Sequence, residues 1–362
     1  MYWFPILLST LYCFLMLVIY KHLHRIKSFE SSELPGIFVS VLVACHNEEG
    51  NIRNLLTDIA DQSYHPDRFE VIIVDDNSTD ETFRTASEYS GIKNLTTIRN
   101  RGWGKKEAIM TGITRASGEL IITTDGDCRA GPHWISSIAQ FYDKYKPDLI
   151  ICPVAIEPGK GFAGKFQELE FLSLQGITAG TATAGMSTMC NGANMAFTRK
   201  AYELHAANLH PEIDSGDDIF LLHSIKKDKN AEIRWLESMK ALVITSPANT
   251  LRTFLMQRKR WISKSSAYRD LCTIILATAT FAMTAVQAGT FILAFVSFKY
   301  AVIFLLVFLI KSVPDFLILR NTTRRYGRAP LMKWFLPSQI IYPFYVLSVV
   351  LLAAGGWKKP EG

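Results

Sequence analysis

The sequence contains no cysteine framework. Its six cysteines are scattered over 362 residues, and no two of them form a Cys-x-x-Cys pair. A secreted domain stapled by disulfides and a zinc site built on paired cysteines are therefore both excluded. The thiols are expected to be reduced, in a cytosolic domain or within a bilayer. Repeats, low-complexity segments and nucleic-acid-binding motifs are also absent, so no nucleic-acid partner is expected.

Long stretches of the chain lack charge. Hydrophobic residues make up 49% of the sequence and charged residues only 20%, which is more apolar than is usual for a soluble domain. The apolar runs are close to the ~20 residues that a membrane-spanning helix needs. We predict an N-terminal anchor at residues 1–21 and three further transmembrane helices at 271–298, 300–319 and 331–354.

The first apolar run has no basic residue before it and no small-x-small cleavage site after it. A signal peptide normally has both, so an uncleaved anchor is expected. Lys and Arg gather at residues 21–27, 258–269 and 320–328, and most of the net charge of +6 lies in such loops. Positive loops favour the cytoplasm and anionic lipids. We therefore predict a multi-pass protein, as in a bacterial inner membrane, with residues 37–271 cytoplasmic and the link 297–300 external.

Between the first two apolar runs, short buried strands alternate with helical patterns. The segments FVSVLVAC, FEVIIVDD and GELIITTD are apolar runs that end in polar residues, as buried parallel strands do. Other segments have apolar residues at helical spacing, such as Ile52, Leu55 and Ile59. This alternation predicts an α/β domain at 37–250 with a doubly wound, mostly parallel sheet. The Gly/Thr/Ala-rich stretch 176–185 is interpreted as a flexible active-site segment or a turn-rich linker.

Acidic residues stand where these strands are expected to end. Ligands of open parallel sheets bind beyond the carboxyl ends of the strands. The turn TTDGDC places Asp125 and Asp127 after a buried strand, and hard cations such as Mg²⁺ or Mn²⁺ prefer oxygen ligands of this kind. Such a pair alone is more often a solvated loop, but Asp76 in VDDNSTD lies at the same expected edge. Asp76 can accept a hydrogen bond from a pyrimidine base or a ribose hydroxyl.

Three further segments carry candidate residues. Lys105, at a predicted helix start, can pair with a diphosphate, although an ordinary solvated lysine is the alternative. Gly192 and Asn194, in CNGANMAF, suit either close backbone approach to a ligand or a tight turn. Asp217 and Asp218 precede an apolar helix in SGDDIFLL, where acidic residues commonly cap helices. The functional alternative is a general base, because an acceptor hydroxyl loses a proton as it attacks.

The segment 251–270 joins the α/β domain to the second apolar run and contains QRKRW, residues 257–261. Its position predicts an interfacial segment, and a basic anchor on the cytoplasmic side is the simplest interpretation. The order and spacing of VSVLVACHNEEGNI, VIIVDDNSTDET, GKKEAIMTGI, TTDGDC, NGANMAF, SGDD and QRKRW offer another one. Together these motifs resemble the family 2 glycosyltransferases. They are most similar to the membrane-embedded QxxRW branch, which includes cellulose, chitin and hyaluronan synthases, poly-N-acetylglucosamine synthase and ceramide glucosyltransferase.

This resemblance implies a GT-A fold, a nucleotide-sugar donor, a divalent metal (Mg²⁺ or Mn²⁺) and inversion at the anomeric carbon. Asp218 matches the general base of the family, and Asp127, with Asp125, matches the metal site. The residues implied in donor binding are His46, Glu48, Asp76, Lys105, Asp125, Gln257, Arg260 and Trp261. Those implied in the acceptor region are Gly192, Asn194, Asp217 and Trp261.

The sequence departs from the family at two places. The first strand ends ACHNE, so Ala44 and His46 replace the usual Pro and Tyr. His46 can still stack on a base, although the preference for uracil is weakened. The base motif reads Gly216-Asp217-Asp218 instead of Thr-Glu-Asp, which leaves the choice between the two aspartates open.

Several functions remain open at this stage. The first hypothesis is an inverting hexosyltransferase that moves a sugar from a nucleotide-sugar, with a UDP-sugar as the expected donor, to a lipid or lipid-linked glycan acceptor. A processive polysaccharide synthase is the alternative within the family. A non-catalytic nucleotide-sugar-binding subunit would require a lost base or metal ligand, and neither is lost. A membrane-bound nucleotidyltransferase would leave QRKRW and SGDD unexplained.

Overall fold

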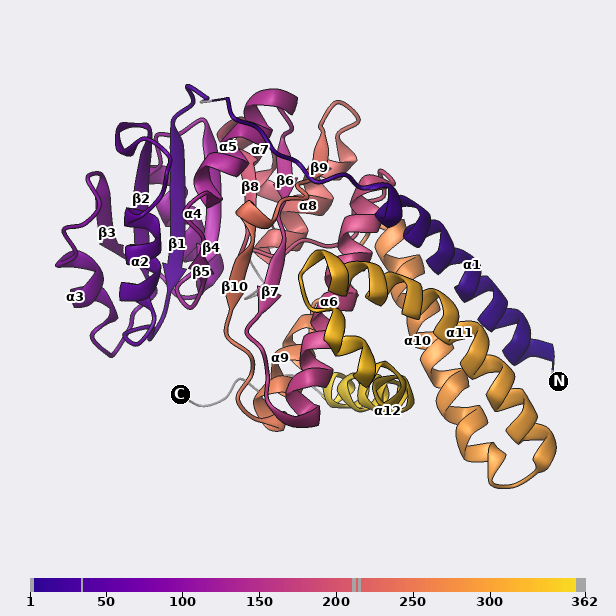
Figure 1. Cartoon of the computed structure of the whole chain (residues 1–362). Coiled ribbons are helices and arrows are strands. Elements are labelled where there is room, and N and C mark those ends of the chain that lie inside the picture. The colour runs from indigo at the N-terminus through magenta and orange to yellow at the C-terminus, as the bar shows by residue number, and fades with distance from the viewer. Residues whose placement is uncertain (1–2, 34, 210–212, 214–215, 356–362) are drawn as a thin grey trace. The chain divides into compact units, whose positions relative to one another are not determined.

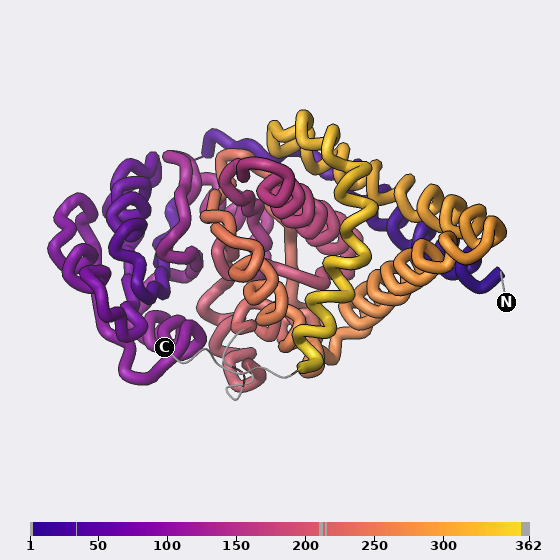
Figure 2. The backbone as a smooth tube through the Cα atoms, turned by 90° about the horizontal axis from the view of Figure 1, so that it is seen from below, coloured from indigo at the N-terminus to yellow at the C-terminus, as the bar shows by residue number. Residues whose placement is uncertain are grey.

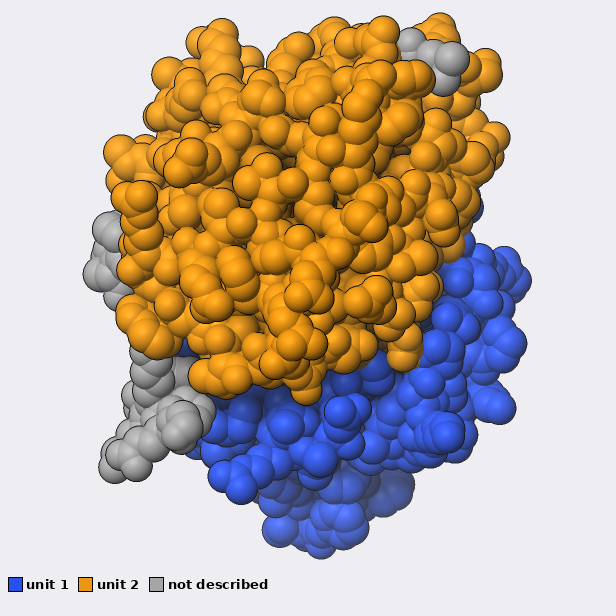
Figure 3. All heavy atoms as spheres, turned by 90° about the vertical axis from the view of Figure 1, so that its left-hand side faces the viewer, with its two compact units in different colours: residues 1–25, 158–188, 247–362 blue, residues 26–157, 189–246 orange. Residues whose placement is uncertain are grey.

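The structure is a computed structural model that describes residues 3–33, 35–209, 213 and 216–355. The chain divides into two compact units, which Figure 3 shows in different colours. Unit 1 comprises residues 1–25, 158–188 and 247–362, and unit 2 comprises residues 26–157 and 189–246.

Unit 2 is built on a seven-stranded sheet in the order β3-β2-β1-β4-β8-β6-β9 (Figure 1). The β1 strand pairs in parallel with β2 and β4, and β3 pairs in parallel with β2, whereas β8 is antiparallel to both β4 and β6. A smaller sheet has the order β5-β10-β7. The strands are β1 Val39–Cys45, β2 Phe69–Asp75, β3 Leu95–Arg99, β4 Leu120–Asp125, β5 Arg129–Ala130, β6 Leu149–Ile151, β7 Val154–Ile156, β8 Met195–Thr198, β9 Ile233–Trp235 and β10 Val243–Thr245.

Helices cover both faces of the large sheet. On one face, alternate residues of β1 pack with Ile52, Leu55 and Ile59, which are fully buried as their spacing predicts. On the other face, Gly112 of α4 lies against Leu42. The mostly parallel α/β fold is therefore confirmed. The helices of unit 2 are α2 Ile52–Ala60, η1 Pro66–Arg68, α3 Thr82–Ser87, α4 Lys105–Arg115, α5 Trp134–Tyr145, α7 Arg199–His205, η2 Ala206–Asn208, α8 Asp217–Lys227 and η3 Met239–Ala241.

Unit 1 is helical. Its described residues include four helices that are long and apolar enough to cross a membrane, spanning Trp3–Arg25, Leu271–Ala294, Phe298–Arg325 and Ala329–Ala354. Figure 1 shows α12 nearly end-on, whereas α1, α10 and α11 lie across the page, so α12 runs across the other three. Figure 2 shows the same crossing from below. The elements are α1 Trp3–Arg25, α6 Gly161–Thr183, α9 Leu251–Ser263, η4 Ser265–Ala267, α10 Leu271–Ala294, α11 Phe298–Arg325, η5 Ala329–Trp334 and α12 Phe335–Ala354.

The Gly/Thr/Ala-rich stretch is where the sequence interpretation was wrong. Instead of a flexible or turn-rich segment, most of it forms the last turns of α6. Its small residues serve close helix packing. A Cβ at Gly176 would lie 2.4 Å from Thr322 Oγ1 of α11, and one at Gly180 would lie 2.8 Å from the carbonyl oxygen of Ile19 in α1. Glycine permits these contacts because it has no side chain.

A charged cluster lies inside the helical unit. The Lys311 ammonium is 1% exposed and donates to Asp315 Oδ2 at 2.7 Å and to Gln339 Oε1 at 2.9 Å. The hydroxyl of Tyr12 donates to Asp315 Oδ1 at 2.9 Å. Charges inside an apolar bundle are costly unless they are paired, so this network ties α1, α11 and α12 together.

We expect Lys311→Met to destabilise the protein by about 3–5 kcal/mol, because it leaves the Asp315 carboxylate buried without its counter-charge. The double variant Lys311→Met, Asp315→Leu removes both charges and should regain much of that loss. Thermal unfolding in detergent measures both variants. Equal destabilisation by the single and double variants would contradict this account of the cluster.

Candidate active site

The carboxyl ends of three parallel strands meet at one edge of the sheet in unit 2. The register pairs Ala44 of β1 with Val74 of β2 on one side and with Asp125 of β4 on the other. The loops that follow these strands therefore start side by side. They carry the histidine and most of the carboxylates that the sequence singled out.

The loops after β1 and β2 are tied to each other. The Asn47 side chain accepts a hydrogen bond from the Thr79 backbone at 2.9 Å, and its backbone N–H donates to Ser78 Oγ at 2.9 Å. Asn47 has a φ of 54° and Asn77 has a φ of 58°, the left-handed region that asparagine tolerates better than most residues. These contacts give the strand ends a defined shape.

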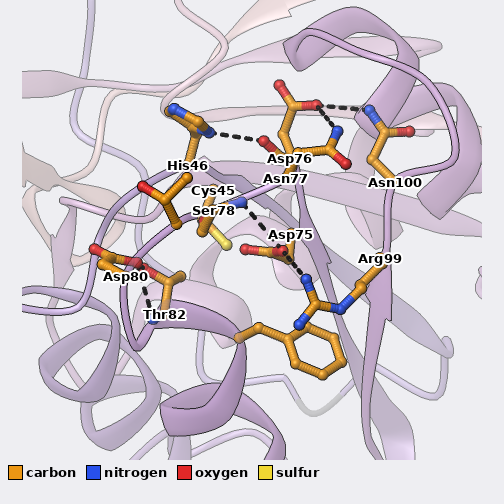
Figure 4. A network of polar contacts seen from close by, with 12 residues as sticks. Cys45, His46, Asp75, Asp76, Asn77, Ser78, Asp80, Thr82, Arg99 and Asn100 are labelled. Carbon is orange, nitrogen blue, oxygen red and sulfur yellow. Dashed lines mark hydrogen bonds and ion pairs between the residues drawn. The ribbon is translucent and has the colours of Figure 1, made fainter. Parts of the chain in front are cut away.

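Asp76 lies at the centre of the network in Figure 4. Its carboxylate accepts hydrogen bonds from Gly104 N at 2.9 and 3.0 Å and from Asn100 Nδ2 at 2.8 Å. The His46 ring donates from Nδ1 to the Asp76 carbonyl oxygen at 2.7 Å. His46 is exposed. The network fixes both side chains where the strands end.

The neighbouring Asp75 has a structural position. It is fully buried, and the Arg99 guanidinium lies 3.7 Å from its Oδ2 (Figure 4). The same guanidinium lies over the Phe83 ring at 4.1 Å. Asp75 therefore holds the β2–β3 side of the edge together.

The turn after β4 brings three carboxylates close together. A Cβ at Gly126 would lie 3.0 Å from Glu48 Cγ, so glycine is needed between Asp125 and Asp127 for the turn to approach Glu48. Burial raises the pKa of Glu48. The hydrogen bond from Asn51 opposes this rise, and the charges of Asp127 and Asp125 add to it. Negative charge is therefore concentrated at this turn.

This donor set fits a hard divalent cation. Asp127 is oriented by Thr245, whose hydroxyl donates to its Oδ2 at 2.8 Å. Within the described parts of the chain, no three His, Cys, Asp or Glu side chains form a complete metal site. That is compatible with Mg²⁺ or Mn²⁺, since Mg²⁺ usually takes one or two carboxylates and completes its shell with phosphates and water. Asp127 and Asp125 would hold such an ion.

Lys105 connects this turn to the candidate bases. Its ammonium forms an ion pair with Asp125. Partial burial would lower the pKa of Lys105, but the charges of Asp125 and Asp217 raise it above its usual value. The lysine is therefore a permanent positive charge among these acids.

Asp218 lies next to Gly192. The Gly192 N–H donates to Asp218 Oδ2 at 3.0 Å, and the Ile219 N–H lies 2.8 Å from Oδ1. A Cβ at Gly192 would lie 3.7 Å from Lys105 Nζ, so these elements converge. Burial, followed by the charge of Asp218, raises the pKa of Asp217, and Lys105 limits that rise. Ser215 of the SGDD motif lies outside the described residues.

Asn194 has a packing position. Its side chain is fully buried and accepts from the Trp134 indole at 2.9 Å. Its amide nitrogen donates to the carbonyl oxygens of Pro153 at 2.7 Å and Ala241 at 2.8 Å. Asn194 therefore anchors the turn that carries Gly192. Both the oxygen and the nitrogen of its side-chain amide are hydrogen-bonded to other protein groups.

The residues of QRKRW belong to unit 1. They lie on α9, which starts at a capping box of Thr250 and Thr253. Arg260 is exposed and Trp261 is partly exposed, whereas Gln257 accepts a hydrogen bond from Arg258. The roles assigned to Gln257, Arg260 and Trp261 remain predictions.

Sequence reasoning missed the residues that orient the acids. Asn100 holds Asp76 from 24 residues away, and Thr245 holds Asp127 from 118 residues away. No spacing rule connects such partners. Arg258 lies within the same motif, but nothing in the sequence indicated that it is buried while Arg260 is exposed.

With this geometry in place, the chain can be compared with known proteins. Residues 40–204 match the family model described as Glycosyl transferase family 2. This segment of the chain is therefore similar to family 2 glycosyltransferase domains. The matched range includes His46 and Asp76, which directly follow β1 and β2, Asp125 at the end of β4, and the turn at Gly192.

The chain spans about a third of the length of the curated relatives that it matches. Glycosyltransferase AglE of Haloferax volcanii is 36% identical over 107 residues, which is 29% of this chain and 34% of the relative. The undecaprenyl-phosphate 4-deoxy-4-formamido-L-arabinose transferase of Edwardsiella ictaluri is 32% identical over 111 residues, covering 30% and 34%. The dodecaprenyl-phosphate galacturonate synthase of Rhizobium johnstonii is 34% identical over 123 residues, covering 33% and 36%.

Among solved structures, a mannosyltransferase from Pyrobaculum calidifontis, solved with GDP-Man and Mn²⁺, matches 97% of both chains. The TM-score is 0.59 at 19% sequence identity, so the likeness concerns the fold. The GT-A fold expected around the family 2 domain is confirmed.

Proposed function

We propose that this protein is an inverting glycosyltransferase that moves a sugar from a nucleotide-sugar to a membrane-associated acceptor, either a lipid or a lipid-linked glycan. The observation that carries the proposal is the convergence of Asp125, Lys105, Gly192 and Asp218 at the carboxyl edge of the sheet. The family 2 match over the same segments supports it.

The strand ends would bind the donor. The Asp76 carboxylate accepts an N–H of the base, and the exposed His46 ring offers a stacking face. Asp125 lies near the ribose, and the Lys105 ammonium supplies positive charge for the diphosphate. Asp127, with Asp125, would hold Mg²⁺ or Mn²⁺, which when bound supplies positive charge to the departing diphosphate. The mannosyltransferase of similar fold was solved with Mn²⁺, and this supports a divalent ion.

Asp218 would act as the general base. The acceptor hydroxyl oxygen forms a new bond to the anomeric carbon while the bond from that carbon to the diphosphate oxygen breaks. The hydroxyl proton passes to the Asp218 carboxylate, and the nucleoside diphosphate leaves with the bonding electrons. Attack on the face opposite the leaving group inverts the anomeric centre. Asp217, whose pKa is raised, would orient the acceptor.

The acceptor is proposed to be lipid-borne. Two relatives, one named a transferase and the other a synthase, have names that specify undecaprenyl phosphate and dodecaprenyl phosphate. The same chain carries four helices, among its described residues, that are apolar enough to span a membrane, and this supports an acceptor that resides in the bilayer. A long-chain acceptor with a polar end suits this arrangement better than a soluble sugar.

Release of free nucleoside diphosphate tests the reaction class. The purified protein is incubated with UDP- and GDP-sugars, a divalent metal and membrane lipid extract. We expect lipid-dependent release of UDP or GDP. A binding subunit would retain the donor intact, and a nucleotidyltransferase would release pyrophosphate from nucleoside triphosphates.

The orientation of the chain is open to a separate labelling test. We expect Lys299→Cys, at the start of α11, to react with a membrane-impermeant thiol reagent in intact cells, because basic loops flank the other ends of α10 and α11. Glu88→Cys, exposed on unit 2, should react only after lysis. The partly exposed Cys13, Cys190 and Cys272 are first replaced by Ser. The reverse pattern would overturn the cytoplasmic placement of the donor site.

A further inference from the structure

Two arginines of QRKRW point in different directions. Residues two apart on a helix are separated by about 200° around its axis. Arg258 is 4% exposed, whereas Arg260 is exposed. The inward arginine therefore has no route to a ligand in solvent, and its charge must serve other residues of unit 1.

The partner of Arg258 is Glu170 on α6. The guanidinium donates from Nε to Glu170 Oε1 at 3.0 Å and from Nη2 to Oε2 at 2.6 Å, a forked pair. The Tyr345 hydroxyl on α12 donates to Glu170 Oε1 at 3.0 Å. Both charged side chains are nearly inaccessible, at 5% and 7%. Breaking such a pair leaves an uncompensated buried charge.

The same guanidinium contacts two residues of the motif. Its Nη1 donates to Gln257 Oε1, and its carbon lies 4.1 Å from the centre of the Trp261 ring. It also lies 4.6 Å from the centre of the Phe254 ring, one turn earlier. A cation near an aromatic face is attracted to the ring, and burial strengthens that attraction. Arg258 thus restrains Gln257 and Trp261 together.

We propose that Glu170 and Arg258 are positioning residues, which hold Gln257 and Trp261 in the orientation needed for sugar transfer. The proposal rests on the proposed function and on the roles in donor and acceptor binding that the family resemblance implies for Gln257 and Trp261. Without the Glu170 carboxylate, the buried guanidinium charge is unpaired and moves toward water, and Trp261 loses the cation against its ring. Helix α6 thereby sets the geometry of α9.

Glu168 provides a matched control. It lies on the same helix, its side chain is 3% exposed, and it pairs with Arg328 at 3.5 Å and Lys165 at 3.2 Å. Neither partner belongs to α9. Glu168→Gln therefore removes a buried carboxylate of equal size and similar burial without touching Arg258.

The first test follows Trp261 directly and needs no activity. The protein is labelled with 5-fluorotryptophan, and the Trp261 signal is assigned by ¹⁹F NMR with Trp261→Phe. We expect Glu170→Gln to shift or broaden that signal and Glu168→Gln to leave it unchanged. An unchanged Trp261 signal in Glu170→Gln would overturn the inference, whatever the protein catalyses.

The second test is kinetic. Glu170→Gln should lower kcat/KM by on the order of 10- to 100-fold, because small misplacements of binding groups cost that much. In a Trp261→Ala background the same change should cost little more, since the two residues act as one unit. Additive losses would assign Glu170 a merely structural role. An inactive natural protein would instead count against the proposed function, and the NMR result would still stand.

Discussion

Asp218→Asn is expected to slow sugar transfer by about 10²–10⁴-fold while donor binding stays nearly normal. The asparagine keeps the shape of the side chain and an oxygen that can accept from Gly192 N–H, so the turn survives. It can no longer take the acceptor proton. The rate of sugar transfer and the affinity for the donor are measured separately, so that the two expectations are tested independently.

Asp217→Asn is the matched control for the base. It changes the neighbouring carboxylate in the first turn of the same helix, and we expect a milder loss, because the proposed role of Asp217 is to orient the acceptor. If the two variants exchange phenotypes, the base is Asp217. If both remain active, the proton leaves by another route and the assignment of a base from the family motif fails.

Asp127→Asn is expected to abolish activity and to weaken donor binding. A metal ion typically supplies several kcal/mol of transition-state stabilisation, and Asp127 is the carboxylate placed to hold it. Chelation should inactivate the natural protein, and added Mg²⁺ or Mn²⁺ should restore it. Activity that is undiminished in excess chelator would refute the metal assignment.

Two variants calibrate that result. Thr245→Val removes only the hydroxyl that donates to Asp127, so its loss should be smaller than that of Asp127→Asn. Asp58→Asn removes a carboxylate that pairs at 2.6 Å with Arg129, which lies two residues after Asp127. It should affect stability and spare activity. If Asp58→Asn loses as much activity as Asp127→Asn, the activity depends on the structure of the turn and not on a metal held by Asp127.

The strands of the donor site were predictable because their signals are local. Continuous apolar runs gave β1, β2 and β4, and the acids after them fall at the strand ends as expected. Helix α2 was equally predictable from the spacing of Ile52, Leu55 and Ile59. Where the local pattern of apolar residues alone determines which side chains are buried, the sequence is sufficient to predict the strand or helix.

Long-range contacts were not predictable. The pairing of Glu170 with Arg258 joins residues 88 positions apart, and each looks like an ordinary surface charge in sequence. The Gly/Thr/Ala-rich end of α6 was interpreted as a flexible or turn-rich segment, because glycine destabilises helices in water. Packing against α1 and α11 favours those small residues instead.

The most direct test of the account is the product itself. Purified protein is incubated with a panel of nucleotide-sugars and membrane lipid extract, with Asp218→Asn in parallel, and the lipids are analysed by mass spectrometry. We expect one lipid species heavier by a single glycosyl residue with the natural protein and almost none with Asp218→Asn. The absence of any glycosylated lipid, or its equal formation by both proteins, would contradict it.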